Sequence, residues 1–256
     1  MEGKVALVTG AASGMGRIIA LRLAQGGAQV AALDLNETGL AALAETSGQI
    51  HSFPCDISSH EDIRSRVADI ESRLGPVDLL VHAAALMPAH ALVDHSVEKV
   101  EFLFRVNFFG TVYMIKTLLP GMLERNRGRM IIFGSIAGVA IVPKMGVYCA
   151  TKSAVNSYVE CLQNELRSTG INIHLVCPPA VNTPLIDQTV DTDTPGSIQE
   201  ARRSGRLADP EKIVAAIERG VAKNKDIIYP GEAWWLMLWK VLLPGLWWRT
   251  VLSFEK

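Results

Sequence analysis

The stretch GVYCATKSAVNSY, residues 146–158, places a tyrosine and a lysine four residues apart. If the stretch is helical, the phenol of Tyr148 and the ammonium of Lys152 lie on one face, one turn apart. A tyrosine of ordinary pKa, about 10, is a poor base at neutral pH. A neighbouring cation favours the phenolate and lowers that pKa, so this pair is suited to moving a proton. The alternative is a half-buried tyrosine whose hydroxyl simply meets water.

A second chemically suggestive group is the glycine-rich sequence TGAASGMG, residues 9–16, between an apolar run and a helical pattern. Gly10 allows a tight turn, Gly14 lets backbone N–H groups approach a pyrophosphate, and Gly16 lets the helix pack closely on the strand. The phosphates would sit at the positive amino end of the helix. This context predicts a dinucleotide site, although glycines also occur in ordinary turns.

Two aspartates follow the next two apolar runs and could contact the rest of a dinucleotide. Asp34 can accept hydrogen bonds from the adenosine ribose hydroxyls, and its charge would repel a 2′-phosphate. Neither Ser13 nor Leu35 offers a positive charge for such a phosphate, so the pattern predicts NAD(H) rather than NADP(H). The alternative for Asp34 is an exposed loop carboxylate. Asp56 could bond the adenine amino group or begin an Asx turn before a helix.

Apolar runs alternate with helical periodicity along most of the chain, and these elements must position the residues above. Strands separated by helices of this length form βαβ units with a mostly parallel sheet. The sequence therefore predicts one doubly wound α/β domain over residues 1–232, with a parallel seven-stranded sheet. The expected strands are 4–10, 29–35, 50–57, 77–84, 128–135, 171–179 and 226–231. The expected helices are 15–28, 37–46, 60–75, 96–126 with a break near Asn107, 146–169 and 209–224.

Composition narrows the functional classes. The 256-residue chain has a formal net charge of −1, so no overall attraction to nucleic acid or to an anionic membrane is expected. Its four cysteines show no metal-binding spacing, so we predict no metal site and reduced thiols in an intracellular protein. The first residues enter a strand directly, without a secretory signal pattern. We expect a cytoplasmic protein, located at the membrane surface if the segment described next binds lipid.

The segment 233–256 differs from the rest of the chain because it holds all five tryptophans. Lys240, Pro244 and Arg249 interrupt its apolar run, which makes it a marginal candidate for a membrane-spanning helix. Tryptophans mixed with basic residues suit peripheral contact with a membrane through residues 233–252. Equally, the segment could fold over a pocket or be buried in an oligomer interface.

Five motifs occur together in a fixed order: TGAASGMG, NFFG at 107–110, Ser135, YCATK at 148–152 and PPAVNTP at 178–184. In this combination the chain resembles the classical short-chain dehydrogenase/reductase family over residues 4–231. The resemblance implies a Rossmann fold, nicotinamide-dependent hydride transfer, and a homodimer or homotetramer formed through helices 96–126 and 146–169. It also implies a catalytic tetrad, carried here by Asn107, Ser135, Tyr148 and Lys152.

Each member of this tetrad has an expected role. Lys152 would lower the pKa of Tyr148 and hold the nicotinamide ribose, while Ser135 would donate to the substrate oxygen. Asn107 would open its helix to hold a water that links Lys152 to solvent. Ser135 could instead cap the element after its strand, and Asn107 could be a helix-end residue. The residues predicted to line the cofactor site are Gly10, Ser13, Gly14, Met15, Gly16, Asp34, Leu35, Asp56, Ile57, Ala83, Ala84, Tyr148, Lys152, Pro178, Val181 and Thr183.

The chain departs from the family pattern at two places. HAAA, residues 82–85, stands where the family has Asn-Asn-Ala-Gly, so the amide side chains that tie neighbouring strands together are absent. His82 is expected to be a packed, hydrogen-bonded core histidine. Residues 178–179 are Pro-Pro rather than Pro-Gly, and the second proline removes a backbone N–H. Val181 and Thr183 are still expected to meet the nicotinamide carboxamide.

The substrate side is expected to be apolar. Residues 184–206 would form a lid, with the arginines at its far end on a solvated helical face, and residues 136–146 would form one wall of the pocket. We therefore predict an NAD(H)-dependent oxidoreductase that interconverts a hydrophobic secondary alcohol and its ketone, such as a steroid, a retinoid or a long-chain 3-keto lipid. The alternative is a catalytically silent nucleotide-binding sensor or scaffold of the same fold.

Overall fold

The computed structural model describes residues 2–190 and 192–255, and its centre is a sheet of seven parallel strands. The strand order is β3-β2-β1-β4-β5-β6-β7, so the direction of winding reverses between β1 and β4. The parallel, doubly wound sheet predicted from the sequence is thereby confirmed. The strands are β1 (Val5–Thr9), β2 (Gln29–Asp34), β3 (Ile50–Pro54), β4 (Val77–His82), β5 (Gly128–Phe133), β6 (Ile171–Val176) and β7 (Ile227–Ile228).

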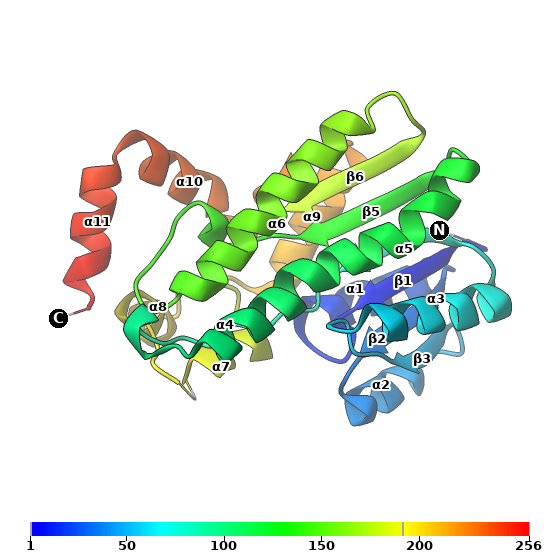
Figure 1. Ribbon diagram of the computed structural model, residues 1–256, viewed down its shortest axis with the longest axis horizontal. Helices are drawn as coiled ribbons and strands as arrows, with labels where there is room; N and C mark the ends of the chain where they lie inside the picture. Colours follow the sequence, from blue (N-terminus) through cyan, green and yellow to red (C-terminus); the bar gives the residue numbers. More distant parts are fainter. Residues whose placement is uncertain (1, 191, 256) are drawn as a thin grey trace.

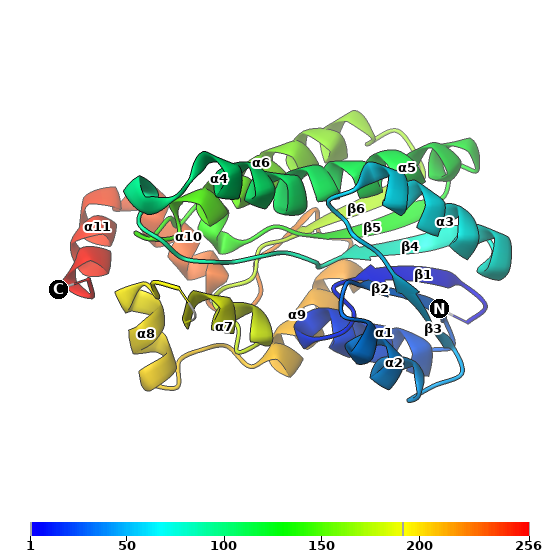
Figure 2. The same ribbon diagram turned by 60° about the horizontal axis from the view of Figure 1, so that its bottom comes forward.

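Helices cover both faces of this sheet, as Figures 1 and 2 show. Leu7 of β1 belongs to the core formed with α3, α5 and α6, whereas the next residue, Val8, belongs to the core formed with α1, α2 and α9. Strands buried on both faces explain the nearly continuous apolar runs in the sequence. The helices are α1 (Gly14–Gln25), α2 (Glu37–Ala44), α3 (His60–Leu74), α4 (Val97–Phe104), α5 (Gly110–Glu124), α6 (Gly146–Glu165), α7 (Pro184–Val190), α8 (Gly196–Arg203), α9 (Pro210–Ala222), α10 (Ala233–Leu242) and α11 (Pro244–Ser253).

Two segments differ in detail from the expected helices. Between α4 and α5, residues 105–109 form a π-helical turn around Asn107, so the helix widens where the sequence suggested a break. The stretch Val97–Glu124 is long and apolar enough to cross a membrane, but half of its most apolar window is buried inside the protein. The expected lid, 184–206, contains the two short helices α7 and α8; α8 includes Arg202 and Arg203, which were expected on a helical face, whereas α7 was not predicted.

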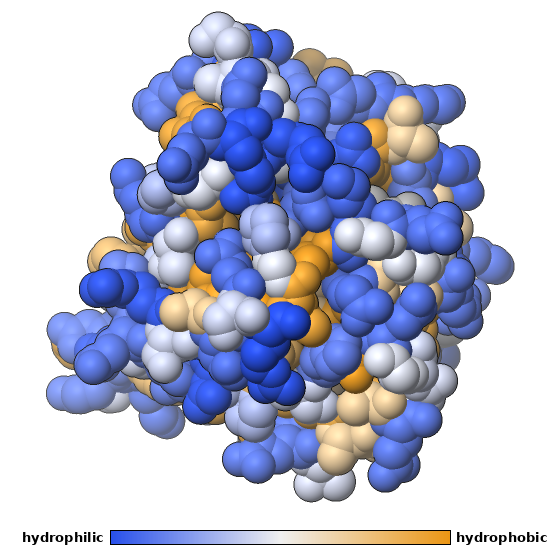
Figure 3. Space-filling view, turned by 90° about the vertical axis from the view of Figure 1, so that its right-hand side faces the viewer, coloured by the Kyte–Doolittle hydropathy of each residue, from blue (hydrophilic) through white to orange (hydrophobic). Residues whose placement is uncertain are grey.

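The tryptophan-rich segment forms α10 and α11, with Pro244 in the first turn of the second helix. Both helices stand at one end of the molecule, near α8 and the chain that leads into α6 (Figures 1 and 2). Figure 3 shows the opposite end, where hydrophilic side chains cover most of the surface. The described part of this apolar segment, 233–255, is therefore gathered at a single end of the fold.

The four cysteines are free thiols with different surroundings. Cys55, Cys149 and Cys177 are buried, whereas Cys161 on α6 is exposed.

Candidate active site

Two adjoining cavities lie at the carboxyl ends of the strands. The first, about 330 Å³, is lined by the glycine turn and the ends of β2, β3 and β4, and we call it the glycine-turn cavity. The second, about 260 Å³, is lined by Ser135, Tyr148 and mostly apolar side chains, and we call it the Tyr148 cavity. Met15, Thr183 and Leu185 line both. Open α/β sheets bind ligands at such an edge, where the strand order reverses.

The backbone of the glycine turn forms a cradle at the amino end of α1. Gly10 and Gly14 have φ angles of 68° and 52°, which residues with side chains rarely adopt. A Cβ on Gly16 would overlap the carbonyl oxygen of Gly10, so α1 can begin this close to β1 only with glycine there. The positive end of the helix dipole therefore lines the cavity. Shape and dipole both fit the pyrophosphate of a dinucleotide.

Asp34 and Asp56 line the same cavity. The carboxylate of Asp34 accepts hydrogen bonds from the backbone N–H groups of Ala12 at 3.1 Å and Asn36 at 3.0 Å. These contacts fix its orientation and leave lone pairs for further donors such as ribose hydroxyls. Asp56 accepts from the N–H of Ser58 at 2.8 Å, so it forms the Asx turn before α3 as well as lining the cavity.

His82 ties β4 to β1 in place of the missing amide side chains. Its Nδ1 lies 2.9 Å from Oγ1 of Thr9, and the same oxygen accepts hydrogen bonds from the N–H groups of Ala83 and Ala84. Because both lone pairs of that oxygen are used, its hydroxyl proton is available to Nδ1. Burial, and then the charge of Lys152, lowers the pKa of His82 to about 3. The ring is the neutral, packed core histidine that was expected.

Tyr148 and Ser135 bring hydroxyl groups to the wall of the Tyr148 cavity. Tyr148 lies in the first turn of α6, and Ser135 follows β5. Burial raises the pKa of Tyr148 above its usual value of 10, while an interaction with the Ser135 side chain acts in the opposite direction. Ser135 Oγ also accepts a hydrogen bond from the N–H of Ala137 at 3.0 Å. The capping role and the position on the cavity wall are therefore both present.

Lys152 is buried close to Tyr148 but lines neither cavity. Its Nζ lies 5.9 Å from the centroid of the Tyr148 ring and donates a hydrogen bond to the carbonyl oxygen of Phe133 at 2.8 Å. Burial lowers the pKa of Lys152 to about 8. The structure thus places the phenol and the ammonium together, whereas the expected contact of Lys152 with a ribose stays a prediction.

Asn107 joins three segments around the π-helical turn. Its side-chain oxygen accepts from the N–H of Leu86 at 2.8 Å, and its amide donates to the carbonyl oxygen of Leu86 at 2.9 Å and to Oγ1 of Thr151 at 3.2 Å. Thr151 precedes Lys152, so Asn107 links the chain after β4 to the helix that carries the lysine. Asn107 lines neither cavity, and the water it was expected to hold stays a prediction.

Asn156 is a residue of the site that sequence reasoning missed. Its side-chain oxygen accepts from the N–H of Ser135 at 3.4 Å, and its amide donates to the carbonyl oxygen of Ser135 at 3.1 Å. A Cβ on Gly134 would overlap the Asn156 amide oxygen, so the backbone before Ser135 must approach closely. The available signal was the spacing of Tyr148, Lys152 and Asn156, which places all three on one face of α6.

The tryptophan-rich segment supplies much of the Tyr148 cavity wall, which sequence reasoning left as one of three alternatives. Trp247, Thr250 and Val251 of α11 and Phe254 just after it follow the helical spacing i, i+3, i+4 and i+7. This spacing is the signal that could have identified them as lining residues. The apolar segment 136–146 lines the cavity as predicted. Leu185, Ile186, Ser197, Ile198 and Ala201 of the predicted lid also line it, and lining residues outside the predicted segments are Met87, Pro179, Ala180, Glu232, Leu236, Trp239, Trp247, Thr250, Val251 and Phe254.

Most of the predicted cofactor residues gather around the glycine-turn cavity. Those that line it are Gly10, Ser13, Gly14, Met15, Gly16, Asp34, Leu35, Asp56, Ile57, Ala83, Ala84 and Thr183. Pro178, Val181 and Tyr148 line the Tyr148 cavity instead. Lining residues that the prediction lacked are Leu33, Cys55, Ala85, Leu86, Phe102, Val106, Pro184, Leu185 and Gln188. Within residues 2–190 and 192–255, no group of three or more potential metal ligands is gathered closely enough to hold an ion.

Comparison with known proteins identifies the family of this chain. A family model described as short chain dehydrogenase matches residues 4–194. An uncharacterized oxidoreductase of Staphylococcus saprophyticus is 34% identical over 194 residues, covering 74% of this chain and 83% of the relative. Estradiol 17-beta-dehydrogenase 11 of Rattus norvegicus is 28% identical over 240 residues, covering 91% and 77% of the two chains.

Solved structures agree in fold and carry related cofactors. A short chain dehydrogenase/reductase from Burkholderia phymatum in complex with NAD has a TM-score of 0.81 and 26% identity, with 91% of this chain and 90% of that chain covered. A closed form of serine dehydrogenase complexed with NADP⁺ has a TM-score of 0.81 and 27% identity, with 88% and 93% covered. The glycine cradle fits the dinucleotide that these proteins hold, and this chain belongs to the short-chain dehydrogenase family of nicotinamide-dependent oxidoreductases.

Proposed function

We propose that this protein interconverts a hydrophobic secondary alcohol and its ketone with NAD(H), using Tyr148 as the acid and base. One observation carries the proposal: the Tyr148 and Ser135 hydroxyls line an apolar cavity that adjoins the glycine-turn cavity along Met15 and Thr183. A ligand that spans both cavities brings its reactive end to these hydroxyls. The alternative of a silent sensor requires the same cavities but no turnover.

In the proposed reaction, each direction transfers one hydride and one proton. Bound NAD(H) supplies the hydride in ketone reduction and accepts it in alcohol oxidation. In reduction, Tyr148 Oη gives its proton to the carbonyl oxygen as that oxygen gains charge, and Ser135 Oγ holds the same oxygen in place. In oxidation, the phenolate of Tyr148 takes the proton of the alcohol. Lys152 favours that phenolate because its ammonium lies close to the ring.

The substrate class follows from the cavity walls. Aliphatic, methionine and tryptophan side chains form most of the Tyr148 cavity, with Glu232 as the charged side chain among its described lining residues. Such a surface favours an apolar ring system or chain over a phosphate or a sugar. The printed name of the rat relative, an estradiol dehydrogenase, supports steroid-like alcohols as a first substrate group.

The preference for NAD(H) rests on the charges near the end of β2. Asp34 lines the glycine-turn cavity, and no lysine or arginine occurs among the described residues that line it. A 2′-phosphate would therefore meet a carboxylate without a compensating cation. Comparing turnover with NADH and with NADPH at equal concentration tests this part, and a preference for NADPH would contradict it.

Substitution of the phenol tests the reaction directly. We expect Tyr148→Phe to lower kcat at least about 100-fold, because general acid–base catalysis contributes that much or more. NADH affinity should be nearly unchanged, since Tyr148 does not line the glycine-turn cavity. Tyr158→Phe, on the same helix but half-buried elsewhere, is the matched control. Cofactor binding by the parent protein without turnover on a broad ketone and alcohol panel would favour the silent sensor.

A peripheral membrane contact is the second part of the proposal. While one side of α10 and α11 lines the Tyr148 cavity, Trp235, Leu242, Leu243 and Leu246 are exposed. Exposed tryptophan and leucine on helices that also carry Lys240 and Arg249 suit the interface of a lipid bilayer. This location would bring apolar substrates close to the Tyr148 cavity.

A further inference from the structure

The segment 233–255 closes the Tyr148 cavity with one side of its helices. Leu236 and Trp239 of α10 and Trp247 and Val251 of α11 line the cavity, and Trp247 is only 5% exposed. The indole N–H of Trp247 donates to the carbonyl oxygen of Ile141 at 3.1 Å, and its ring packs edge-to-face on Trp239 with centroids 5.4 Å apart. The tryptophans therefore act as a wall only while this segment stays against residues 136–145.

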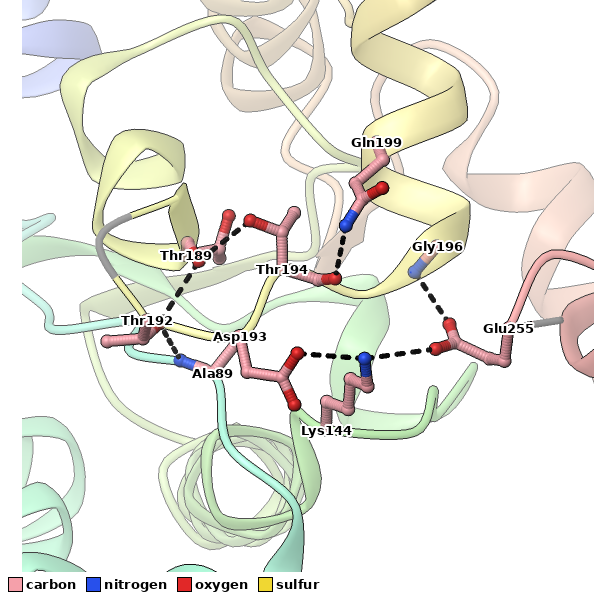
Figure 4. A network of polar contacts seen from close by, with 9 residues as sticks. All are labelled: Ala89, Lys144, Thr189, Thr192, Asp193, Thr194, Gly196, Gln199 and Glu255. Carbon is pink, nitrogen blue, oxygen red and sulfur yellow. Dashed lines mark hydrogen bonds and ion pairs between the residues drawn. The ribbon is translucent and has the colours of Figure 1, made fainter.

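A polar cluster fastens the far end of that segment, and Figure 4 shows its members. One carboxylate oxygen of Glu255 accepts a hydrogen bond from the N–H of Gly196, the first residue of α8, at 2.7 Å. The other lies 3.8 Å from Nζ of Lys144, which in turn donates to Asp193 at 2.8 Å. We call these four residues the Lys144 cluster. It joins the tryptophan-rich segment to the lid and to the chain that enters α6.

Lys144 is the junction of these contacts. It has a left-handed backbone (φ 62°), and its carbonyl oxygen accepts from the N–H of His90 at 2.7 Å. The N–H of Asp193 donates to the carbonyl oxygen of Ala89 at 2.9 Å. Lys144 also precedes Tyr148 by only four residues. The lid, the tryptophan-rich segment and the chain that enters α6 thus meet at one ammonium group.

The ion pairs of the Lys144 cluster are partly open to water. The side chains of Lys144 and Asp193 are 32% and 45% exposed and those of Lys144 and Glu255 are 32% and 13% exposed, so each pair contributes modestly to stability. Gly231, two residues before α10, has a φ angle of 63° and offers a hinge where few other residues would fit. Gly196 has no room for a side chain, because a Cβ there would overlap the carbonyl oxygen of Phe254.

We propose that Lys144 and Glu255 hold the segment 233–255 closed over the substrate cavity, and that substrate enters when this ion pair separates. They are positioning residues, because they act through Trp239 and Trp247 rather than on the reacting atoms. The substrate part rests on the proposed function above, whereas the closure itself is a property of the fold. The segment then selects substrates by length, since only molecules that reach the tryptophans contact it.

Tryptophan fluorescence reports this closure without any turnover, because all five tryptophans lie in the segment. Replacing the exposed Trp234 and Trp235 with phenylalanine leaves the three that face the protein or each other. In that background we expect Glu255→Gln and Lys144→Gln to shift the emission to longer wavelength. Acrylamide quenching should rise, with the open fraction increasing roughly two- to fivefold, as expected for losing one partly exposed ion pair.

Glu218→Gln is the matched control, because Glu218 pairs with Arg22, neither of which lines the Tyr148 cavity, and should leave the emission unchanged. Raising the salt concentration should move the parent protein toward the variants, since screening weakens the pair. If Glu255→Ala and Lys144→Gln both keep the emission and quenching of the parent protein, the proposal is overturned.

A kinetic comparison separates this proposal from the proposed function. With NADH bound, we expect Glu255→Gln to raise KM for a four-ring steroid ketone roughly two- to fivefold, while cyclohexanone, which cannot reach the tryptophans, keeps its KM. An equal change in KM for both ketones would contradict selection by length. Absence of turnover with either ketone would count against the proposed function, and the fluorescence result would still decide the closure.

Discussion

Burial changes the pKa values of the residues at the candidate active site. Tyr148 and Lys152 are almost fully buried, and burial raises the pKa of the phenol while it lowers that of the ammonium to about 8. Both effects favour the neutral forms. We propose that the ammonium of Lys152, 5.9 Å from the centroid of the Tyr148 ring, favours the phenolate and so eases its formation.

This dependence predicts a shift in the pH profile of alcohol oxidation. Oxidation needs the phenolate, so its rate should rise with pH. We expect Lys152→Met to move that rise to higher pH by roughly one to three units, because the phenol loses its neighbouring cation. Measuring kcat/KM with NAD⁺ from neutral to alkaline pH checks this, with Lys152→Arg as the charge-retaining control. An unmoved profile in Lys152→Met would contradict the role given to the lysine.

At the residue scale, the sequence predicted groups that form recognisable local patterns. Tyr148 and Lys152 follow helical spacing, and the glycine turn follows a fixed order, so their chemistry could be inferred from the chain alone. Helical spacing places Asn156 on the same face of α6 as Tyr148 and Lys152, but its two hydrogen bonds to Ser135, 21 residues away, could not be inferred from that spacing.

Elements position the site through a few close approaches between backbones. The start of α1 against β1 is one of these, because a Cβ at position 16 would overlap the carbonyl oxygen of Gly10. The same approach brings the amino end of the helix to the cavity. A side chain there would move the helix end away from the phosphates it is expected to bind.

We expect Gly16→Ala to lower the free energy of unfolding by about 1–3 kcal/mol, as overpacking of a tight contact does. NADH affinity should fall at least about tenfold, because displacement of α1 disturbs the phosphate cradle. Urea unfolding and a fluorescence titration with NADH measure the two effects. Gly48→Ala is the control, since a Cβ at that position meets no atom within 4 Å. Unchanged NADH affinity in Gly16→Ala would remove the cradle from the cofactor site.

The sequence predicted the strands with long apolar runs, whereas the lid helices α7 and α8 form from polar segments. The strands are buried on both faces and so read as continuous apolar runs. Helices α7 and α8 carry polar and turn-forming residues, and their structure depends on partners such as Glu255 and Ala89, which lie far away in the chain. The amphipathic spacing of α11 was present but was obscured by Trp248 and Leu246, apolar residues that do not line the cavity.

The two opposite ends of the molecule differ in the hydropathy of their exposed side chains. One end is covered by hydrophilic side chains, as Figure 3 shows, while the other carries α10 and α11 with exposed Trp235, Leu242 and Leu246. Several exposed large apolar side chains on neighbouring helices favour a contact with lipid or protein. Their place beside the substrate cavity is what makes lipid the partner we propose.

We expect the protein to sediment with phosphatidylcholine vesicles. The triple variant Trp235→Ser, Leu242→Ser and Leu246→Ser should lower the partition coefficient at least about tenfold, because each buried apolar side chain contributes on the order of 1 kcal/mol or more. Leu123→Ser, near the end of α5, removes an exposed leucine elsewhere and serves as the control. Equal sedimentation of parent and triple variant would exclude this surface as the lipid contact.

Alkylation of the buried cysteines can be used to follow the opening of the site over time. Cys55 lines the glycine-turn cavity, Cys149 follows Tyr148, and the thiol of Cys177 lies 3.7 Å from the side-chain oxygen of Asn156. Burial raises the pKa of all three thiols, so each reacts with an alkylating reagent only after its surroundings have opened. The order in which they are alkylated is therefore the order in which the glycine-turn cavity, the start of α6 and the contacts of Asn156 open.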